Sequence, residues 1–268
     1  MISTLITRAD DFGSSNASNQ AIYQAIKKGN YIKNISCMAV GPMMEAGAEL
    51  LKSMSARDVS IGMHGTLTSE WTYLKWFPMT DTKHIPSLIT KDGTFPSEFD
   101  SQNREIDPDE VLIEFSAQLD QLTRLGLHIS YFDTHMMPEL FYPVLIPALK
   151  EWTQKKGLIN HLDWYTLKQN LGPHSYHTVT EGYNLWKNWL ESLTDDYRFT
   201  LMHPMIHSRE TLSFSNDRSG IGMVGAYRAN EYDLLMSGLL DKWCDKKAIQ
   251  RVSYEYAESH LMKHYTEA

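Results

Sequence analysis

Four short apolar segments of the sequence end in histidine or aspartate, residue types that bind metal ions and move protons. The four endings are Asp10-Asp11, His64, Asp133-Thr134-His135 and His203. One histidine at the end of an apolar run is weak evidence for a functional site, but the same ending on four runs is a pattern. Because active sites of barrels and open α/β sheets form at the carboxyl ends of parallel strands, we expect these side chains to meet at one mouth.

The adjacent carboxylates Asp10 and Asp11 constrain the backbone geometry at the end of the first strand. Neighbouring residues of an extended strand point to opposite faces, so both can face the mouth only where the strand turns. Two close carboxylates repel each other unless a cation lies between them or one stays protonated. This favours one aspartate as a metal ligand and the other as a proton carrier. The alternative is that one of them caps the following helix.

A carboxylate and two histidines with open coordination positions suit catalytic zinc and other divalent ions. His174 and His177 are also spaced like ligands, but they lie in a loop-like segment without an acidic neighbour. We therefore do not expect these two residues to form a site.

Short apolar runs alternate with longer amphipathic ones along the chain. Strands are predicted at 4–9, 34–40, 59–64, 129–133, 158–162, 199–202 and 250–254. Helices are predicted at 18–28, 43–54, 108–125, 143–156, 181–193 and 229–245. This alternation implies parallel strands joined by right-handed crossovers. We expect an α/β fold, a barrel-like distorted TIM-type (β/α) barrel of about seven strands, with a doubly wound open sheet as the alternative.

The chain is predicted to form one domain over residues 1–268, interrupted by an insertion or lid at about 65–107. That segment has weak periodicity, and long segments of this kind are usually functional or inserted. Trp71 and Trp76 lie in it beside Tyr73 and Phe77. These rings are predicted either to stack on a substrate, or to attach the insertion to the barrel or bury a subunit interface.

Composition excludes several other classes of protein. The 268 residues are 42% hydrophobic and 22% charged, with a formal net charge of −8, so we expect a globular protein without a nucleic-acid groove. The two cysteines, Cys37 and Cys244, do not form a disulfide scaffold. No signal peptide and no membrane helix are predicted. The expected location is the cytoplasm.

Several motifs together resemble the YdjC/ChbG-like carbohydrate deacetylases (chito-oligosaccharide-type deacetylases). They are TRADDFG at 7–13, NQAI at 19–22, NISCM at 34–38, GMHGTLT at 62–68, DTH at 133–135, LMHP at 201–204 and the segment 228–235. The resemblance covers nearly the whole chain, and the Ala-Asp-Asp-Phe-Gly block is its most specific part.

The resemblance implies a metal-dependent hydrolase that removes acetyl groups from a small N-acetylated carbohydrate. Carried over by position, Asp11, His64 and His135 would hold one divalent metal ion, zinc or magnesium. Asp10 would be the catalytic base, and His203 falls on a late His-Pro motif where an acid role is expected. The resemblance also suggests a homodimer.

Three residues depart from the family pattern. Arg8 replaces a small polar residue, Met137 replaces a second histidine, and Met205 replaces a glycine. None is a proposed ligand, but all could alter the substrate. Arg8, Trp71 and Trp76 are therefore the candidate substrate-binding residues.

Because fold and metal do not determine a reaction, a metal-dependent sugar isomerase or other hydrolase remains an alternative, as does a catalytically silent sugar-binding protein.

Overall fold

The protein is described by a computed structural model that covers residues 2–54, 59–165, 167, 169–194 and 196–261. Its strands are β1 (Thr4–Phe12), β2 (Asn34–Cys37), β3 (Ser60–Gly65), β4 (Tyr131–Thr134), β5 (Ile159–Asn160), β6 (Tyr197–Met202) and β7 (Gln250–Val252). The pairing order is β5-β4-β3-β2-β1-β6, and every pair is parallel. The predicted α/β fold with seven strands is therefore confirmed.

Strand β1 pairs with three other strands of the sheet, and all nine of its residues are buried. Its residues Thr4–Ala9 pair with β6. On the other edge of β1, β7 pairs with the first half of the strand and β2 pairs with the second half. The end strands β5 and β6 are not paired with each other among the described residues. The sheet is thus a curled, incomplete barrel.

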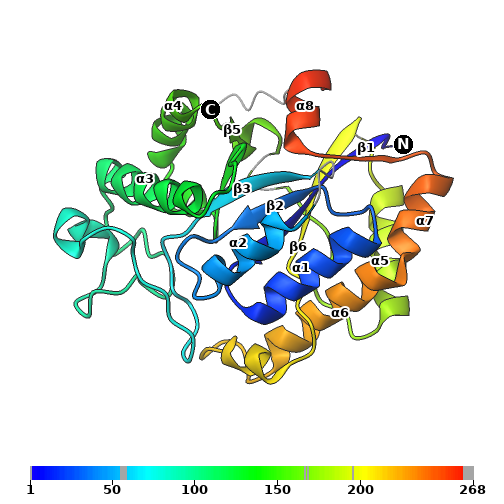
Figure 1. Cartoon of the computed structure of the whole chain (residues 1–268), viewed down its shortest axis with the longest axis horizontal. Helices are drawn as coiled ribbons and strands as arrows, with labels where there is room; N and C mark the ends of the chain where they lie inside the picture. Colours follow the sequence, from blue (N-terminus) through cyan, green and yellow to red (C-terminus); the bar gives the residue numbers. More distant parts are fainter. Residues whose placement is uncertain (1, 55–58, 166, 168, 195, 262–268) are drawn as a thin grey trace.

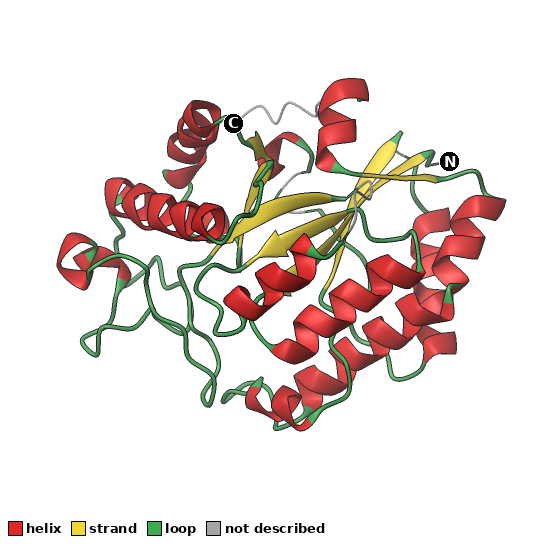
Figure 2. Ribbon diagram, viewed as in Figure 1, coloured by secondary structure: helices red, strands yellow, loops and turns green. Residues whose placement is uncertain are grey.

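The helices cover the outside of the sheet (Figures 1 and 2). They are α1 (Asn16–Lys28), α2 (Met44–Lys52), α3 (Pro108–Arg124), α4 (Leu145–Lys156), α5 (Val179–Glu191), α6 (Met223–Ser237), α7 (Leu239–Lys246) and α8 (Tyr254–His260). Short 3₁₀ helices lie at Thr82–His84, Pro86–Leu88, Pro138–Leu140, His161–Asp163 and Arg209–Ser213. Helices α1, α5 and α6 lie side by side, and α3 packs against α4 at the other end of the sheet (Figure 1).

The prediction of one helix over 229–245 is wrong at its centre. Gly238 has a φ of +68° and separates α6 from α7, because a left-handed residue ends an α-helix. Helix α6 also begins six residues earlier than predicted, at Met223. The predicted strand 250–254 is too long, since Ser253 caps α8 and Tyr254 begins it.

The insertion at 65–107 is fastened to α3 by buried carboxylates. The side chain of Glu114 is fully buried and accepts hydrogen bonds from the backbone N–H groups of Met79 and Thr80, each at 2.9 Å. Glu110 accepts one from Ser87 N–H at 2.7 Å. The insertion is therefore attached to α3 in this structure, and its predicted role as a lid stays a prediction.

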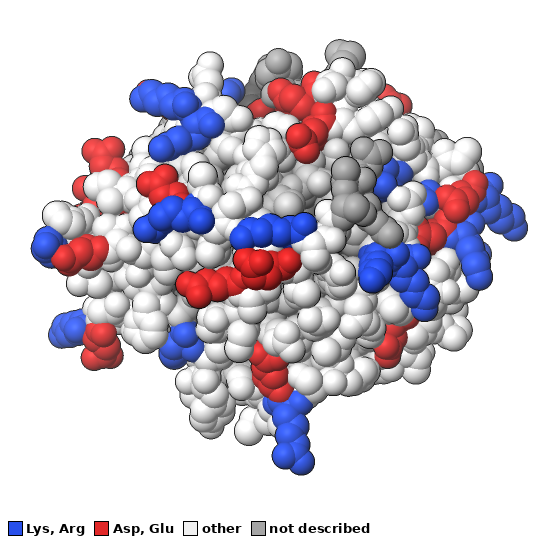
Figure 3. Space-filling view, viewed as in Figure 1, with Lys and Arg blue, Asp and Glu red and all other residues white. Residues whose placement is uncertain are grey.

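The surface shown in Figure 3 mixes lysine and arginine with aspartate and glutamate, and no continuous basic stripe crosses that face. No helix in the described part of the chain is long and apolar enough to cross a membrane.

Replacement of Glu114 by alanine should loosen the insertion. Two part-buried N–H groups lose their acceptor, and a lost hydrogen bond typically costs about 0.5–1.5 kcal/mol. We expect a lower free energy of unfolding in urea and faster hydrogen exchange at Met79 and Thr80. The control is Glu105→Ala, at an exposed position of the same segment. Equal stability of the two variants would contradict this anchoring role.

Candidate metal centre and its cavity

The end of β1 turns, so that Asp10 lines the cavity while Asp11 faces His64 and His135. The register with β2 shifts between Ala9 and Phe12, and Asp11 has a left-handed φ of 63°. This irregularity removes the strict alternation of side chains expected in a regular strand. The alternative capping role is wrong, because Ser15 is the N-cap of α1 and accepts from Ser18 N–H.

The three predicted ligands meet at the ends of β1, β3 and β4. Asp11 Oδ1 lies 3.5 Å from His64 Nε2 and 3.3 Å from His135 Nδ1. The two ring nitrogens are 3.2 Å apart. Ligands at about 2.0–2.2 Å from a tetrahedral ion are separated by about 3.4 Å, so these distances match the edges of such a site.

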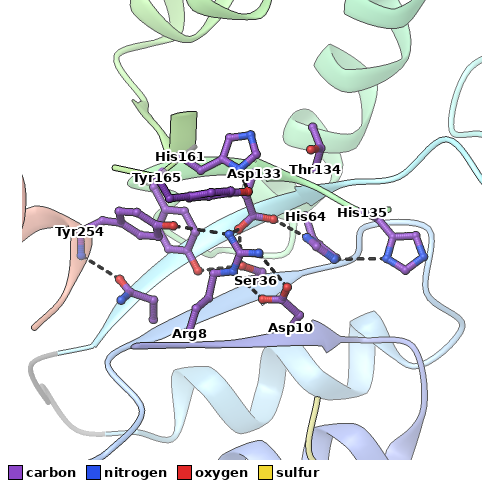
Figure 4. A network of polar contacts seen from close by, with 12 residues as sticks. Arg8, Asp10, Ser36, His64, Asp133, Thr134, His135, His161, Tyr165 and Tyr254 are labelled. Carbon is purple, nitrogen blue, oxygen red and sulfur yellow. Dashed lines mark hydrogen bonds and ion pairs between the residues drawn. The ribbon is translucent and has the colours of Figure 1, made fainter. Parts of the chain in front are cut away.

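Each histidine has a carboxylate on its other ring nitrogen. His64 Nδ1 contacts Asp133 Oδ1, as Figure 4 shows. His135 Nε2 lies 3.0 Å from Glu70 Oε1. Outer carboxylates of this kind fix the tautomer and orientation of metal-binding histidines. Asp133 ends a predicted strand but had no predicted role. Glu70, which belongs to the insertion, was not among the predicted site residues.

The buried carboxylates favour positive charge on both rings. Burial opposes the charged form, but Asp133 and Asp10 outweigh it and raise the pKa of His64 to about 9. At His135 burial again opposes the charge, and Glu70 and Asp11 raise the pKa to about 10. The metal-free centre therefore holds protons at neutral pH in the place where it could hold a cation.

Arg8 connects the proposed base to the ligand network (Figure 4). Its guanidinium contacts both oxygens of Asp10, at 2.5 and 2.7 Å, and lies 2.9 Å from Asp133 Oδ2. Arg8 is only 2% exposed, and it also lies over the ring of Phe199. Arg8 contributes to the cavity lining, but the contacts just described already occupy its guanidinium. Its predicted role in substrate binding stays a prediction.

A separate observation indicates that these residues fit a divalent ion. Asp11 Oδ1 is buried and has no hydrogen-bond partner among the described residues, although a buried carboxylate oxygen normally has one. The burial of Asp11 would raise its pKa, but Arg228 and the two histidines hold it well below its usual range. An ionised, unsatisfied oxygen facing two imidazoles is a suitable ligand set for zinc and similar ions.

The centre opens into a cavity of about 930 Å³, a size typical of small-molecule sites. Asp10, His64, His135 and His203 contribute to its lining together with Trp71. Trp76 is not among the lining residues, is 2% exposed and packs edge-on against the ring of His135. The cavity therefore brings Trp71, but not Trp76, to a place where it could contact a sugar.

A second cluster lies beside the first in the same cavity lining. His203 is held neutral, because burial and the charge of Arg228 lower its pKa to about 4. Its backbone N–H donates to Glu231 Oε2, and Glu231 Oε1 lies 3.1 Å from His174 Nδ1. The prediction that His174 lacks an acidic neighbour is thus wrong, because Glu231 lies next to it in the folded structure. Glu231 was missed because helix α6 brings it from a distant part of the sequence.

The chain is similar to several known proteins. The family model described as YdjC-like protein matches residues 4–246. A carbohydrate deacetylase of Listeria monocytogenes serotype 4b (strain CLIP80459) is 32% identical over 157 residues, covering 58% of this chain and 58% of that protein. A carbohydrate deacetylase of Vibrio cholerae serotype O1 (strain M66-2) is 29% identical over 152 residues, covering 56% and 55%. The chain thus matches little more than half the length of these curated relatives.

Two solved structures share the fold. A protein from Enterococcus faecalis V583, described as a candidate for cellobiose-phosphate cleavage, has a TM-score of 0.77 at 20% identity, covering 95% of this chain and 98% of that one. The catalytic domain of a peptidoglycan N-acetylglucosamine deacetylase from Eubacterium rectale has a TM-score of 0.57 at 10% identity, covering 100% and 95%. The resemblance found in the sequence is confirmed over nearly its full length, and the chain belongs to the YdjC-like protein family.

Proposed function

We propose that this protein is a metal-dependent deacetylase that hydrolyses the acetamide of a small N-acetylated carbohydrate. The observation that supports it most is the triad of Asp11, His64 and His135, whose ligand atoms lie 3.2–3.5 Å apart beside a cavity. The names of the curated relatives point to the same reaction.

A divalent ion held by these three residues would supply a Lewis acid for the acyl oxygen and a water of lowered pKa. Asp10 lines the cavity next to the triad, and we assign it the removal of a proton from the attacking water. Both of its oxygens contact Arg8, but a carboxylate oxygen has a second lone pair and can accept from water as well. Arg8 thereby fixes the direction in which the base acts.

The reaction joins the water oxygen to the acyl carbon and breaks the carbon–nitrogen bond, so the departing amine needs a proton. We assign its delivery to His203. Since the pKa of His203 is about 4, its ring carries no proton at pH 7 before the reaction. The proton that it delivers is therefore the one that Asp10 removes from the water, which passes to His203 as negative charge develops on the tetrahedral intermediate and then to the departing nitrogen.

Acetate release from a panel of N-acetylated mono- and disaccharides tests the proposal. We expect release from at least one sugar, loss of most turnover after treatment with a chelator, and recovery when zinc or magnesium is added back. A sugar isomerase would give a new sugar without acetate. Binding of sugars without any turnover would instead indicate a silent binding protein.

Amide replacements should separate the two aspartates. Asp10→Asn keeps all three ligands, so the ion should stay bound while kcat falls by on the order of 10²–10⁴, the usual contribution of a general base. Asp11→Asn weakens an anionic ligand, so ion affinity should fall and excess metal should partly restore turnover. Metal content, melting temperature and acetate release are measured on one preparation of each variant.

His203→Gln is the companion variant, because it should keep the ion and lose turnover. Near-normal turnover of a stable, metal-replete Asp10→Asn protein would exclude the base role. Complete metal loss in that variant would mean that the two aspartates are assigned in reverse.

Metal binding should release protons. The pKa values of about 9 at His64 and about 10 at His135 mean that both rings are protonated in the metal-free protein at pH 7. An ion must displace these protons, so its apparent affinity should rise with pH by up to about a hundredfold per unit below pH 9. Calorimetry in buffers of different ionisation enthalpy should give nearly two protons per ion. Proton-neutral binding at pH 7 would contradict this electrostatic picture.

A further inference from the structure

Arg228 on α6 contacts a proposed metal ligand, and the mechanism above gives it no task. Its Nη1 lies 2.7 Å from Asp11 Oδ2. The side chain is 13% exposed, and its guanidinium lies 5.5 Å from the ring centre of Phe214 and 5.9 Å from that of Trp71. A cation next to a ligand of another cation needs a physical reason, because the two charges repel each other.

The two oxygens of Asp11 face different partners. Oδ1 faces His64 Nε2 and His135 Nδ1, whereas Oδ2 faces Arg228. A carboxylate can bind an ion through one oxygen or through both. The charge of Arg228 next to Oδ2 repels an ion from that oxygen, so the ion is directed to Oδ1, which faces the two rings.

We infer that Arg228 is a positioning residue that restricts Asp11 to one-oxygen ligation and so keeps coordination positions open for water and substrate. This inference rests on the proposed metal site. It implies that Arg228 weakens ion binding, since its charge repels the ion and it occupies an oxygen that could chelate. The centre therefore has lower ion affinity but an open coordination sphere.

The surroundings of Arg228 fix it in this position. The rings of Trp71 and Phe214 lie near the guanidinium. The carbonyl oxygen of Arg228 accepts from Met205 N–H at 3.1 Å, and Glu231, one turn further along α6, accepts from His203 N–H. The helix is thus attached to the segment that follows β6, and the guanidinium cannot easily leave Asp11.

Arg228→Met tests the inference, because methionine keeps an apolar stem against the rings and removes the charge. With zinc or cobalt(II) alone and no sugar, we expect ion affinity, measured by competition with a chelator, to rise by about tenfold or more. The visible absorption of the cobalt(II) form should weaken, because a chelating Asp11 raises the coordination number. Turnover of the sugar should fall. Arg228→Lys should keep the parental affinity more closely.

The matched control is Arg218→Met, which removes another arginine of the cavity lining. Arg218 contacts Glu98 and is not paired with a ligand, so ion affinity and the cobalt(II) spectrum should stay as in the parent.

Reduced ion affinity in Arg228→Met, with the parental melting temperature, would overturn the inference, because a residue that merely supports Asp11 would give that result. An unchanged cobalt(II) spectrum would overturn it too. A parent protein that binds no divalent ion would remove the proposed metal site and this inference together. A parent that binds the ion but releases no acetate would contradict only the proposed reaction.

Discussion

The contact of one buried guanidinium with two carboxylates connects most of the centre. Arg8 holds Asp10 and Asp133 together, and Asp133 in turn contacts the ring of His64. Removing one partner from such a buried network leaves an uncompensated charge, which is strongly destabilising. The direction of the proposed base and the orientation of a proposed ligand therefore depend on the same side chain.

The balance of charge around the triad indicates that the centre needs compensating positive charge. Four buried carboxylates, Asp10, Asp11, Asp133 and Glu70, face only two arginines, Arg8 and Arg228. Four negative charges less two positive ones leave an excess of two. Either two protons on His64 and His135, as their raised pKa values indicate, or one divalent ion can compensate that excess.

Much of the strand arrangement could be predicted from the sequence, and so could the meeting of Asp11, His64 and His135. Apolar runs identify parallel strands, and parallel strands bring their carboxyl ends together. Glu70 was not predicted, and Arg228 and Glu231, although they lie in the segment 228–235 of the resemblance, had no predicted role, because a loop and a helix carry these residues and their positions depend on tertiary packing. The break between α6 and α7 at Gly238 was also missed, because the residues on both sides of it have ordinary helical composition.

Left-handed backbone at non-glycine residues is concentrated at this centre. Asp11, Met136 and Met137 have φ values of 63°, 58° and 46°, and such conformations typically cost on the order of 1–3 kcal/mol each. The rest of the fold has to supply that energy. Selection for thermal stability alone would replace the two methionines by glycine or asparagine, which adopt this conformation more easily. The turn next to His135 therefore carries a conformational cost that other residues at 136 and 137 would lower.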